Sequence, residues 1–266
     1  MNATLQSKGV ALVTGASAGI GAVYADRLAK RGYDLILVAR DVARLNAVAD
    51  HLRATTGREV ELLQADLTVT ADQLRVEKRL QSDERITLLV NNAGVGATQA
   101  LVDSDVDRLD EMIRVNVIAL TRLTRAVAPA MIRRGAGAIV NIASVVAVAP
   151  DLLNGTYGGT KAFVLAFSQS LHQELAPHGI QVQAVLPGAT STNFWVISGR
   201  PVEQLPSEIV MSAEDMVDAS LVGFDRKELV TIPALPDAAD WDRFDAARRA
   251  LGPNLSRASA AARYRA

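Results

Sequence analysis

The sequence predicts an α/β protein with a doubly wound parallel sheet and helices on both of its faces. Three observations indicate this fold class. Apolar runs of strand length alternate with longer segments of helical period along most of the chain. The run Tyr33 to Ala39 is almost continuously apolar, as expected for a strand buried on both faces. A glycine-rich turn, Thr14 to Gly21, joins the first strand to the first helix.

Each element is placed by its apolar pattern and by the turn residues beside it. Gly57 follows the second helix as a stop signal, and Pro187-Gly188 closes the sixth strand. The expected strands are Gly9 to Val13, Tyr33 to Ala39, Val60 to Ala65, Ile86 to Val90, Ala138 to Ala143, Ile180 to Leu186 and a short seventh at Leu229 to Ile232. The expected helices are Gly19 to Lys30, Val42 to Thr55, Ala71 to Gln81, Ser104 to Arg134 and Thr156 to Ala176, and we assign none beyond them.

We expect one domain over residues 1–266, because no linker, internal repeat or low-complexity tract divides the chain. The segment 189–212 interrupts the alternation and is long for a connection within a compact domain, which indicates a functional loop. Two interpretations of its apolar run Phe194 to Ile197 stay open. The run is either a lid over a substrate pocket or a part of the packed core.

Composition excludes several classes of function. The 266 residues carry a net charge of −1, so no global field attracts nucleic acid or an anionic membrane. There is no cysteine, which excludes disulfides and thiolate ligands and fits a reducing, cytoplasmic location. With only three scattered histidines we expect no metal site. The segment Met1 to Lys8 lacks the apolar run of a signal peptide, and no run of about 18 apolar residues predicts a membrane span.

The glycine-rich turn predicts a phosphate site. Gly15 permits a tight turn, and Gly19 and Gly21 let the backbone come close to a phosphate at a helix N-terminus. Because the turn directly follows the first strand, a dinucleotide site is favoured over an ordinary glycine-rich connection. The same residues around Ser17 match the nucleophile elbow of serine hydrolases. That alternative lacks a preceding strand to supply an oxyanion hole, and no histidine has a telling context.

The ends of the second and third strands indicate which dinucleotide binds. Arg40 stands where NAD-binding folds usually carry an acid, and its guanidinium suits a 2′-phosphate, so we expect NADP(H) to be preferred over NAD(H). The alternative interpretation of Arg40 is an ordinary surface charge at a strand end. We interpret Asp41, the next residue, as a cap of the following helix. Asp66 either accepts a hydrogen bond from an adenine amino group or caps the next turn.

Polar residues follow the fourth and fifth strands. Asn91-Asn92-Ala93-Gly94 suits close approach of the backbone to a ligand. Ser144 offers a hydroxyl to a substrate carbonyl, although a serine at a strand end is usually a turn residue. Tyr157 and Lys161 are four residues apart, so on a helix they share one face. A neighbouring ammonium lowers the pKa of a phenol, which predicts a proton donor and acceptor.

Together these motifs resemble the short-chain dehydrogenase/reductase family over roughly Gly9 to Thr192. The resemblance depends on motifs found in the family's order: Thr14 to Gly21, Asn91 to Gly94, Asn116, Ser144, Tyr157-x-x-x-Lys161 and Pro187-Gly188. It implies a Rossmann fold with seven parallel strands in the order 3-2-1-4-5-6-7. It also implies hydride transfer between NAD(P)(H) and a carbonyl or alcohol.

The resemblance also assigns roles to residues. Tyr157 is the implied general acid–base, and Lys161 lowers its pKa and holds the nicotinamide ribose. Ser144 orients the substrate carbonyl, and Asn116 positions a water in a proton relay. The implied cofactor-binding residues are Gly15, Ser17, Gly19, Ile20, Gly21, Arg40, Asp66, Leu67, Asn92, Ala93, Gly94, Tyr157, Lys161, Pro187, Gly188, Thr190 and Thr192.

The resemblance implies a homodimer or homotetramer, formed through the two long helices. It names no substrate, but an apolar lid favours a hydrophobic ketone, a steroid-like ring or an acyl chain over a sugar. Some NADP-dependent members carry a basic residue at the position of Ala18, so the NADP preference depends on Arg40 alone. A non-catalytic NADP-binding sensor or assembly protein is the alternative function. The intact catalytic set argues against it, because a pure binder needs no proton relay.

Overall fold

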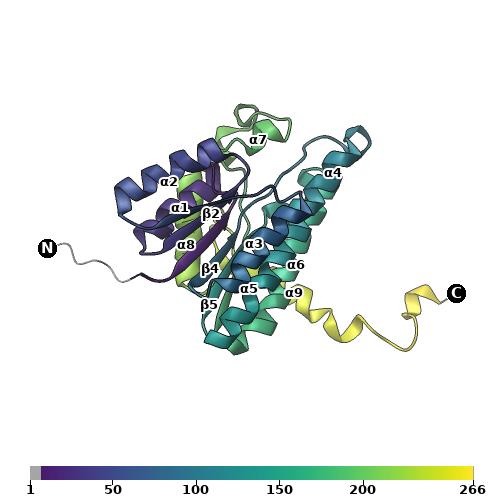
Figure 1. The fold of residues 1–266 in the computed structure, drawn as a ribbon. Helices are drawn as coiled ribbons and strands as arrows, with labels where there is room; N and C mark the ends of the chain where they lie inside the picture. Colours follow the sequence, from purple (N-terminus) through teal and green to yellow (C-terminus); the bar gives the residue numbers. More distant parts are fainter. Residues whose placement is uncertain (1–6, 266) are drawn as a thin grey trace. The chain divides into compact units, whose positions relative to one another are not determined.

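The sheet and its helices have the predicted arrangement (Figure 1). The structure is a computed structural model that describes residues 7–265, so most of the polar segment Met1 to Lys8 lies outside the described residues. Within the described residues, seven parallel strands form one sheet in the order β3-β2-β1-β4-β5-β6-β7, which confirms the predicted fold. The strands are β1 (Val10–Thr14), β2 (Asp34–Ala39), β3 (Val60–Gln64), β4 (Ile86–Asn91), β5 (Gly137–Ile142), β6 (Ile180–Val185) and β7 (Val230–Thr231).

Helices cover both faces of this sheet. One face carries α1 (Gly19–Lys30), α2 (Val42–Thr56) and α8 (Ala213–Asp225), and the other carries α3 (Thr70–Ser82), α5 (Leu120–Arg134) and α6 (Gly155–Leu175). The side chains of β1 show why its sequence is apolar throughout. Ala11 and Val13 are buried in the core of the first face, while Val10 and Leu12 are buried in the core of the second.

The predicted helix Ser104 to Arg134 is divided into three helical segments. They are α4 (Val106–Ile113), a π-helical turn (Arg114–Ala119) and α5. Such turns inside helices are rare and often lie at functional sites. This one contains Asn116 and buries its side chain.

Three helices after the sixth strand were not predicted, α7 (Phe194–Ile197), α8 and α9 (Ala238–Ala250). The sequence does hold a start signal for α8. Ser212 accepts a hydrogen bond from the Asp215 amide, and acidic residues occupy the first turn of the helix. The apolar residues of α8 that contact the core include Met216, Val217 and Leu221.

The chain divides into two compact units, Met1–Pro233 and Ala234–Ala266, each described by itself. In the second unit α9 starts at the N-cap Asp237, whose side chain accepts from the Ala239 amide. The rings of Trp241 and Phe244 pack 5.5 Å apart on this helix. The single domain over residues 1–266 stays a prediction.

One described helical stretch, Val106–Arg134, is long and apolar enough by composition to cross a membrane. The apolar pattern of the sequence predicted no such stretch. In the most apolar window of these 29 residues 56% are buried within the fold. Leu123, Val127 and Met131 there belong to the core of the second face, which accounts for the apolar composition.

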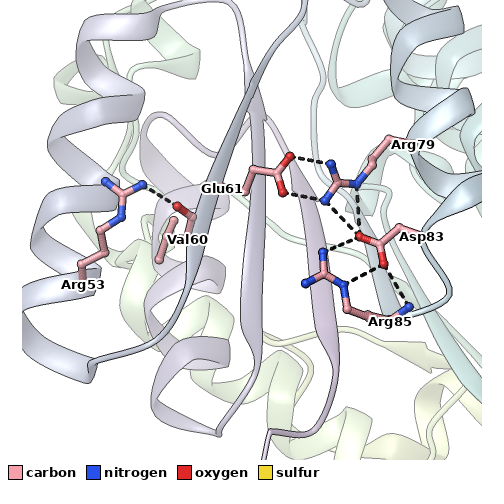
Figure 2. Close-up of polar contacts among 6 residues, drawn as sticks. All are labelled: Arg53, Val60, Glu61, Arg79, Asp83 and Arg85. Atoms are coloured by element: carbon pink, nitrogen blue, oxygen red, sulfur yellow. Dashed lines mark hydrogen bonds and ion pairs between the residues drawn. The ribbon is translucent and has the colours of Figure 1, made fainter.

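At the amino-terminal ends of the strands, a cluster of ion pairs ties β3 to α3 and β4. Figure 2 shows Arg79 between Glu61 on β3 and Asp83 just after α3. Arg85 also pairs with Asp83, at 2.8 Å. Every charge in this cluster has an opposite partner, so we interpret it as structural. The candidate site lies at the other end of the strands.

Candidate active site

The turn after β1 requires glycine at three positions. Gly15 and Gly19 have φ angles of +66° and +53°, which side chains disfavour. A Cβ on Gly15 would lie 2.8 Å from Asn92 Nδ2, and one on Gly21 would lie 2.3 Å from the Gly15 carbonyl oxygen. The turn is therefore packed tightly against the end of β4.

The first turn of α1 is suited to an anion. Its N-cap, Ala18, offers no side-chain cap, and no acidic residue lies in the first turn. The N–H groups at a helix N-terminus then remain available to phosphate oxygens. Thr192 lies over this turn, with its Cγ2 3.1 Å from the position of a Cβ on Gly19. These residues fit a dinucleotide pyrophosphate.

Thr14 joins the turn to the loop after β4, a role that the sequence analysis did not assign. Its hydroxyl oxygen accepts from the amides of Asn92 and Ala93, at 3.0 and 2.9 Å. The side-chain amide of Asn92 donates to the Thr14 carbonyl at 2.8 Å. The predicted residues Asn92, Ala93 and Gly94 are thereby held beside the glycine turn. The position of Thr14, directly before Gly15 at a strand end, is the sequence signal for this role.

Arg40 and Asp66 lie together beyond β2 and β3. Arg40 Nη1 is 3.7 Å from Asp66 Oδ2, and 64% of the Arg40 side chain is exposed. Asp66 Oδ1 accepts from both the amide and the hydroxyl of Thr68, which confirms the capping interpretation. The pKa of Asp66 is lowered by these Thr68 hydrogen bonds and by Arg40, although burial opposes the shift. Asp41 caps α2 by accepting from the Arg44 amide, as predicted.

The remaining predicted cofactor residues lie at the same edge of the sheet. Ile20 is half-buried against the core of the first face, and Leu67 is buried. Thr190 is buried and donates to the Gly188 carbonyl at 3.2 Å, while the Pro187 carbonyl accepts from the Val145 amide. None of the three histidines, all within the described residues, makes a hydrogen bond with Ser17, so the structure does not support the hydrolase alternative.

Ser144, Tyr157 and Lys161 converge at the ends of β5 and α6. All three side chains are buried. The N-cap Asn154 starts α6 by accepting from the Thr156 and Tyr157 amides, and this fixes the turn that carries the phenol. Lys161 Nζ donates to the Ile142 carbonyl at 2.9 Å and lies 5.8 Å from the centre of the Tyr157 ring.

Burial, not the neighbouring lysine, dominates the pKa of Tyr157. Burial raises the pKa of the phenol to about 12, and a hydrogen bond with Ser144 opposes the shift. Burial also lowers the pKa of Lys161 to about 8. The net shift in the Tyr157 pKa is thus opposite to the lowering expected from Lys161, because burial outweighs it. Tyr157 therefore keeps its proton at neutral pH.

Asn116 is buried in the π-helical turn, with its side-chain amide fully engaged as a donor. Its Oδ1 accepts from the Val95 amide at 3.0 Å. Its Nδ2 donates to the Val95 carbonyl at 2.9 Å and to Thr160 Oγ1 at 3.0 Å. A role in positioning water stays a prediction, and the side chain has no N–H left for it.

An apolar cluster surrounds the phenol. Its buried members are Leu109, Met112, Val146 and Tyr157 itself, and its half-buried members are Val95, Ala97, Leu153 and Phe194. The Phe194 ring lies 5.6 Å from the Tyr157 ring, between centroids. These side chains are separate from the two cores of the sheet, and they form an apolar wall beside Ser144, Tyr157 and Lys161.

The segment predicted as lid or core divides between the two roles within α7 (Phe194–Ile197). Trp195 is buried and its indole N–H donates to the Thr190 carbonyl at 2.9 Å. Val196 and Ile197 are exposed, by 63% and 69%. Trp195 thus anchors the segment and Phe194 lines the site. Val196 and Ile197 face outward.

Comparison with known proteins agrees with this geometry. The family model described as short chain dehydrogenase matches residues 9–199. A short-chain dehydrogenase from Sphingobium yanoikuyae, solved in complex with NADPH, is 53% identical with a TM-score of 0.94, and the match covers 97% of this chain and 100% of that one. A bulky-bulky ketone specific alcohol dehydrogenase from Comamonas testosteroni is 47% identical with a TM-score of 0.90, covering 97% and 99%. An uncharacterized oxidoreductase of Staphylococcus epidermidis is 36% identical over 186 residues, which are 69% of this chain and 78% of that protein.

Proposed function

Because this chain belongs to the short-chain dehydrogenase/reductase family and is an NAD(P)-dependent oxidoreductase, we propose that it interconverts bulky, apolar ketones and their alcohols, with NADP(H) as the preferred coenzyme. One observation carries the proposal. The buried phenol of Tyr157 lies beside Ser144, close to Lys161, and against an apolar wall.

The residues that would hold the coenzyme lie along the carboxyl edge of the sheet. The turn Gly15 to Gly21 receives the pyrophosphate, and Asn92 to Gly94 with Lys161 form the inner part of the site. A bound nicotinamide supplies the hydride for reduction or accepts it for oxidation. The protein holds the coenzyme and the substrate in position and transfers one proton to or from the substrate oxygen.

Tyr157 and Ser144 perform the proton chemistry in this proposal. As a ketone is reduced, negative charge develops on its oxygen, and the phenol donates its proton there. The Ser144 hydroxyl donates a hydrogen bond to the same oxygen. Donors fixed where charge develops stabilise the transition state more than the ground state. The Lys161 ammonium, held by the Ile142 carbonyl, offsets the negative charge that Tyr157 gains.

The preference for NADP(H) is supported by Arg40. Its exposed guanidinium stands at the end of β2, where a 2′-phosphate would lie, and its Nη1 is 3.7 Å from Asp66 Oδ2. The Sphingobium structure, similar to this chain over nearly all its length, is in complex with NADPH.

The apolar wall supports the proposed substrate class, and so does the similarity to a ketone-specific dehydrogenase from Comamonas testosteroni. We predict that aryl-alkyl and diaryl ketones are reduced with higher kcat/KM than open-chain ketoses. The expected preference is at least about 10-fold, because one additional methylene in an apolar pocket already gives that much.

The measurement is initial-rate oxidation of NADPH with a panel of such ketones and sugars, repeated with NADH. Turnover of sugars alone would contradict the substrate class, whereas equal efficiency with NADH would contradict only the coenzyme preference. A matched control uses the corresponding alcohols with NADP⁺, which separates a poor substrate from an unfavourable equilibrium.

We also propose that the chain forms a homodimer or homotetramer through α5 and α6. Phe163 and Phe167 stack on α6, and Phe163 is partly exposed together with Ile132 on α5. Exposed apolar side chains on neighbouring long helices favour association. A monomer mass by light scattering would overturn this proposal.

A further inference from the structure

Thr160 lies between the two catalytic residues of α6 and is buried. Its hydroxyl donates to the Tyr157 carbonyl at 2.8 Å, a local bond that helical threonines often make. The same oxygen accepts from Asn116 Nδ2 at 3.0 Å, although Asn116 is 44 residues away in the sequence. The hydroxyl therefore connects the first turn of α6 to the π-helical turn.

The orientation of Asn116 is fixed by its other bonds. Its Oδ1 accepts from the Val95 amide while its Nδ2 donates to the Val95 carbonyl. If the Asn116 amide were flipped, its Nδ2 would face the Val95 N–H and its Oδ1 would face the Val95 carbonyl. Donor would then meet donor, and acceptor would meet acceptor. The second N–H of Nδ2 can then reach only what lies on the far side of Asn116, and that is the Thr160 hydroxyl.

This chain of bonds ends beside the Lys161 ammonium. Gly94 adjoins Val95, and a Cβ on Gly94 would lie 3.3 Å from Asn116 Oδ1 and 3.5 Å from Lys161 Nζ. The loop after β4, the amide of Asn116 and the ammonium therefore meet at one point. A shift of Asn116 would move the loop against which Lys161 is packed.

We propose that Thr160 is a positioning residue, whose hydroxyl holds Asn116 and the loop Gly94–Val95 in register with Tyr157 and Lys161. The proposal rests on the proposed function of the site. Valine is close to threonine in size but has no hydroxyl, so Thr160→Val removes both hydrogen bonds of this side chain. The Asn116 N–H is then left buried without an acceptor, which favours movement of the Asn116 side chain.

The test compares three variants of the intact chain. Thr160→Val removes the hydroxyl, and Thr160→Ser restores it. Thr124→Val is the matched control, because Thr124 is also buried and accepts from an asparagine amide, Asn91 Nδ2, at 3.0 Å, but on α5. The measurements are kcat, KM for the ketone, the Kd for NADPH by fluorescence, and the melting temperature.

We expect Thr160→Val to lower kcat about 10- to 100-fold, the cost of a small misplacement of reacting groups. The Kd for NADPH should rise by less than kcat falls, and Thr160→Ser should recover most of the loss. Thr124→Val should have a lower melting temperature but an unchanged kcat. Wild-type kcat in Thr160→Val would overturn the proposal, and so would an equal loss in the serine variant or in Thr124→Val.

A second readout needs no turnover. The Val95 amide donates to Asn116 Oδ1, so its hydrogen exchange reports whether the loop is held. Thr160→Val should accelerate that exchange and Thr124→Val should not; unchanged exchange would overturn the proposal. If the wild-type chain reduces no carbonyl at all, the proposed function fails by itself, and the Val95 exchange then decides the role of Thr160.

Discussion

Burial pushes both ionisable residues of the candidate site toward their neutral forms. The pKa of Tyr157 is raised to about 12, so the phenol keeps its proton throughout the neutral range. The pKa of Lys161 is lowered to about 8, so its ammonium loses a proton just above neutral pH. Near pH 7 the site therefore holds a protonated phenol beside a lysine that is still mostly charged, a state suited to reduction of a carbonyl.

At the residue scale, the proposed preference for NADP(H) depends on Arg40. We predict that Arg40→Ala raises KM for NADPH about 10- to 100-fold, since a hydrogen bond to a charged group contributes about 1.5 to 3 kcal/mol. KM for NADH should change little, because NADH has no 2′-phosphate. Steady-state kinetics with both coenzymes make the comparison.

Arg133 supplies the control for that prediction. It is exposed to a similar extent, 61% against 64%, but it pairs with Glu84 near the opposite end of the sheet. Arg133→Ala should leave both KM values unchanged. If Arg40→Ala raises KM for NADPH and for NADH equally, Arg40 does not bind the 2′-phosphate.

At the scale of elements, the sequence pattern located the strands and most helices to within about two residues, because apolar runs and turn glycines are local signals. Gly57 shows this, since it ends α2 in the left-handed conformation at φ +66°. The π-helical turn was not predicted, because its i→i+5 bonds leave no mark in the apolar pattern around Asn116. The helix α8 was missed although Ser212 signals its start.

The ion-pair cluster at the amino-terminal ends of the strands gives a prediction about pH (Figure 2). The hydrogen bond from Arg85, assisted by Arg79, lowers the pKa of Asp83 to about 2. An aspartate with a lowered pKa stabilises the fold fully above its unfolded value near 4, and this contribution is lost as pH falls toward 2. Asp83→Asn should therefore lower the free energy of unfolding at pH 7 by about 2 kcal/mol.

Urea unfolding of both proteins across pH 2 to 7 measures this difference. The difference in free energy of unfolding between wild type and Asp83→Asn should disappear near pH 2. As a control, Asp110→Asn removes an exposed i,i+4 pair with Arg114 and should change the free energy of unfolding by less than about 0.5 kcal/mol. A gap that is the same at pH 2 and pH 7 would refute the role of Asp83.

At the scale of the whole sheet, the order of strands explains why distant motifs meet. Strand β1 pairs with β2 on one side and with β4 on the other, so the strand order reverses between β1 and β4. Carboxyl ends of parallel strands share one edge, and ligands bind where the order reverses. The glycine turn after β1 and the loop after β4 are therefore adjacent, and Thr14 bonds them together.

The part of the site that depends on this edge could be predicted from the sequence, because each motif follows a strand. The part that depends on burial could not. The sequence places Lys161 one turn from Tyr157, but it does not show that both are desolvated, and desolvation reverses the expected shift in the phenol's pKa. Nor does it show that the Asn116 side chain is engaged by Val95 and Thr160.

The most direct test of the central claim is the turnover of Tyr157→Phe with NADPH and the best ketone of the panel. We predict that kcat falls about 100- to 10,000-fold, the range that general acid–base catalysis contributes. The Kd for NADPH and the melting temperature should stay close to wild type, because the ring remains packed against Phe194. A variant that binds NADPH and turns over at the wild-type rate would show that the phenol is not the proton donor.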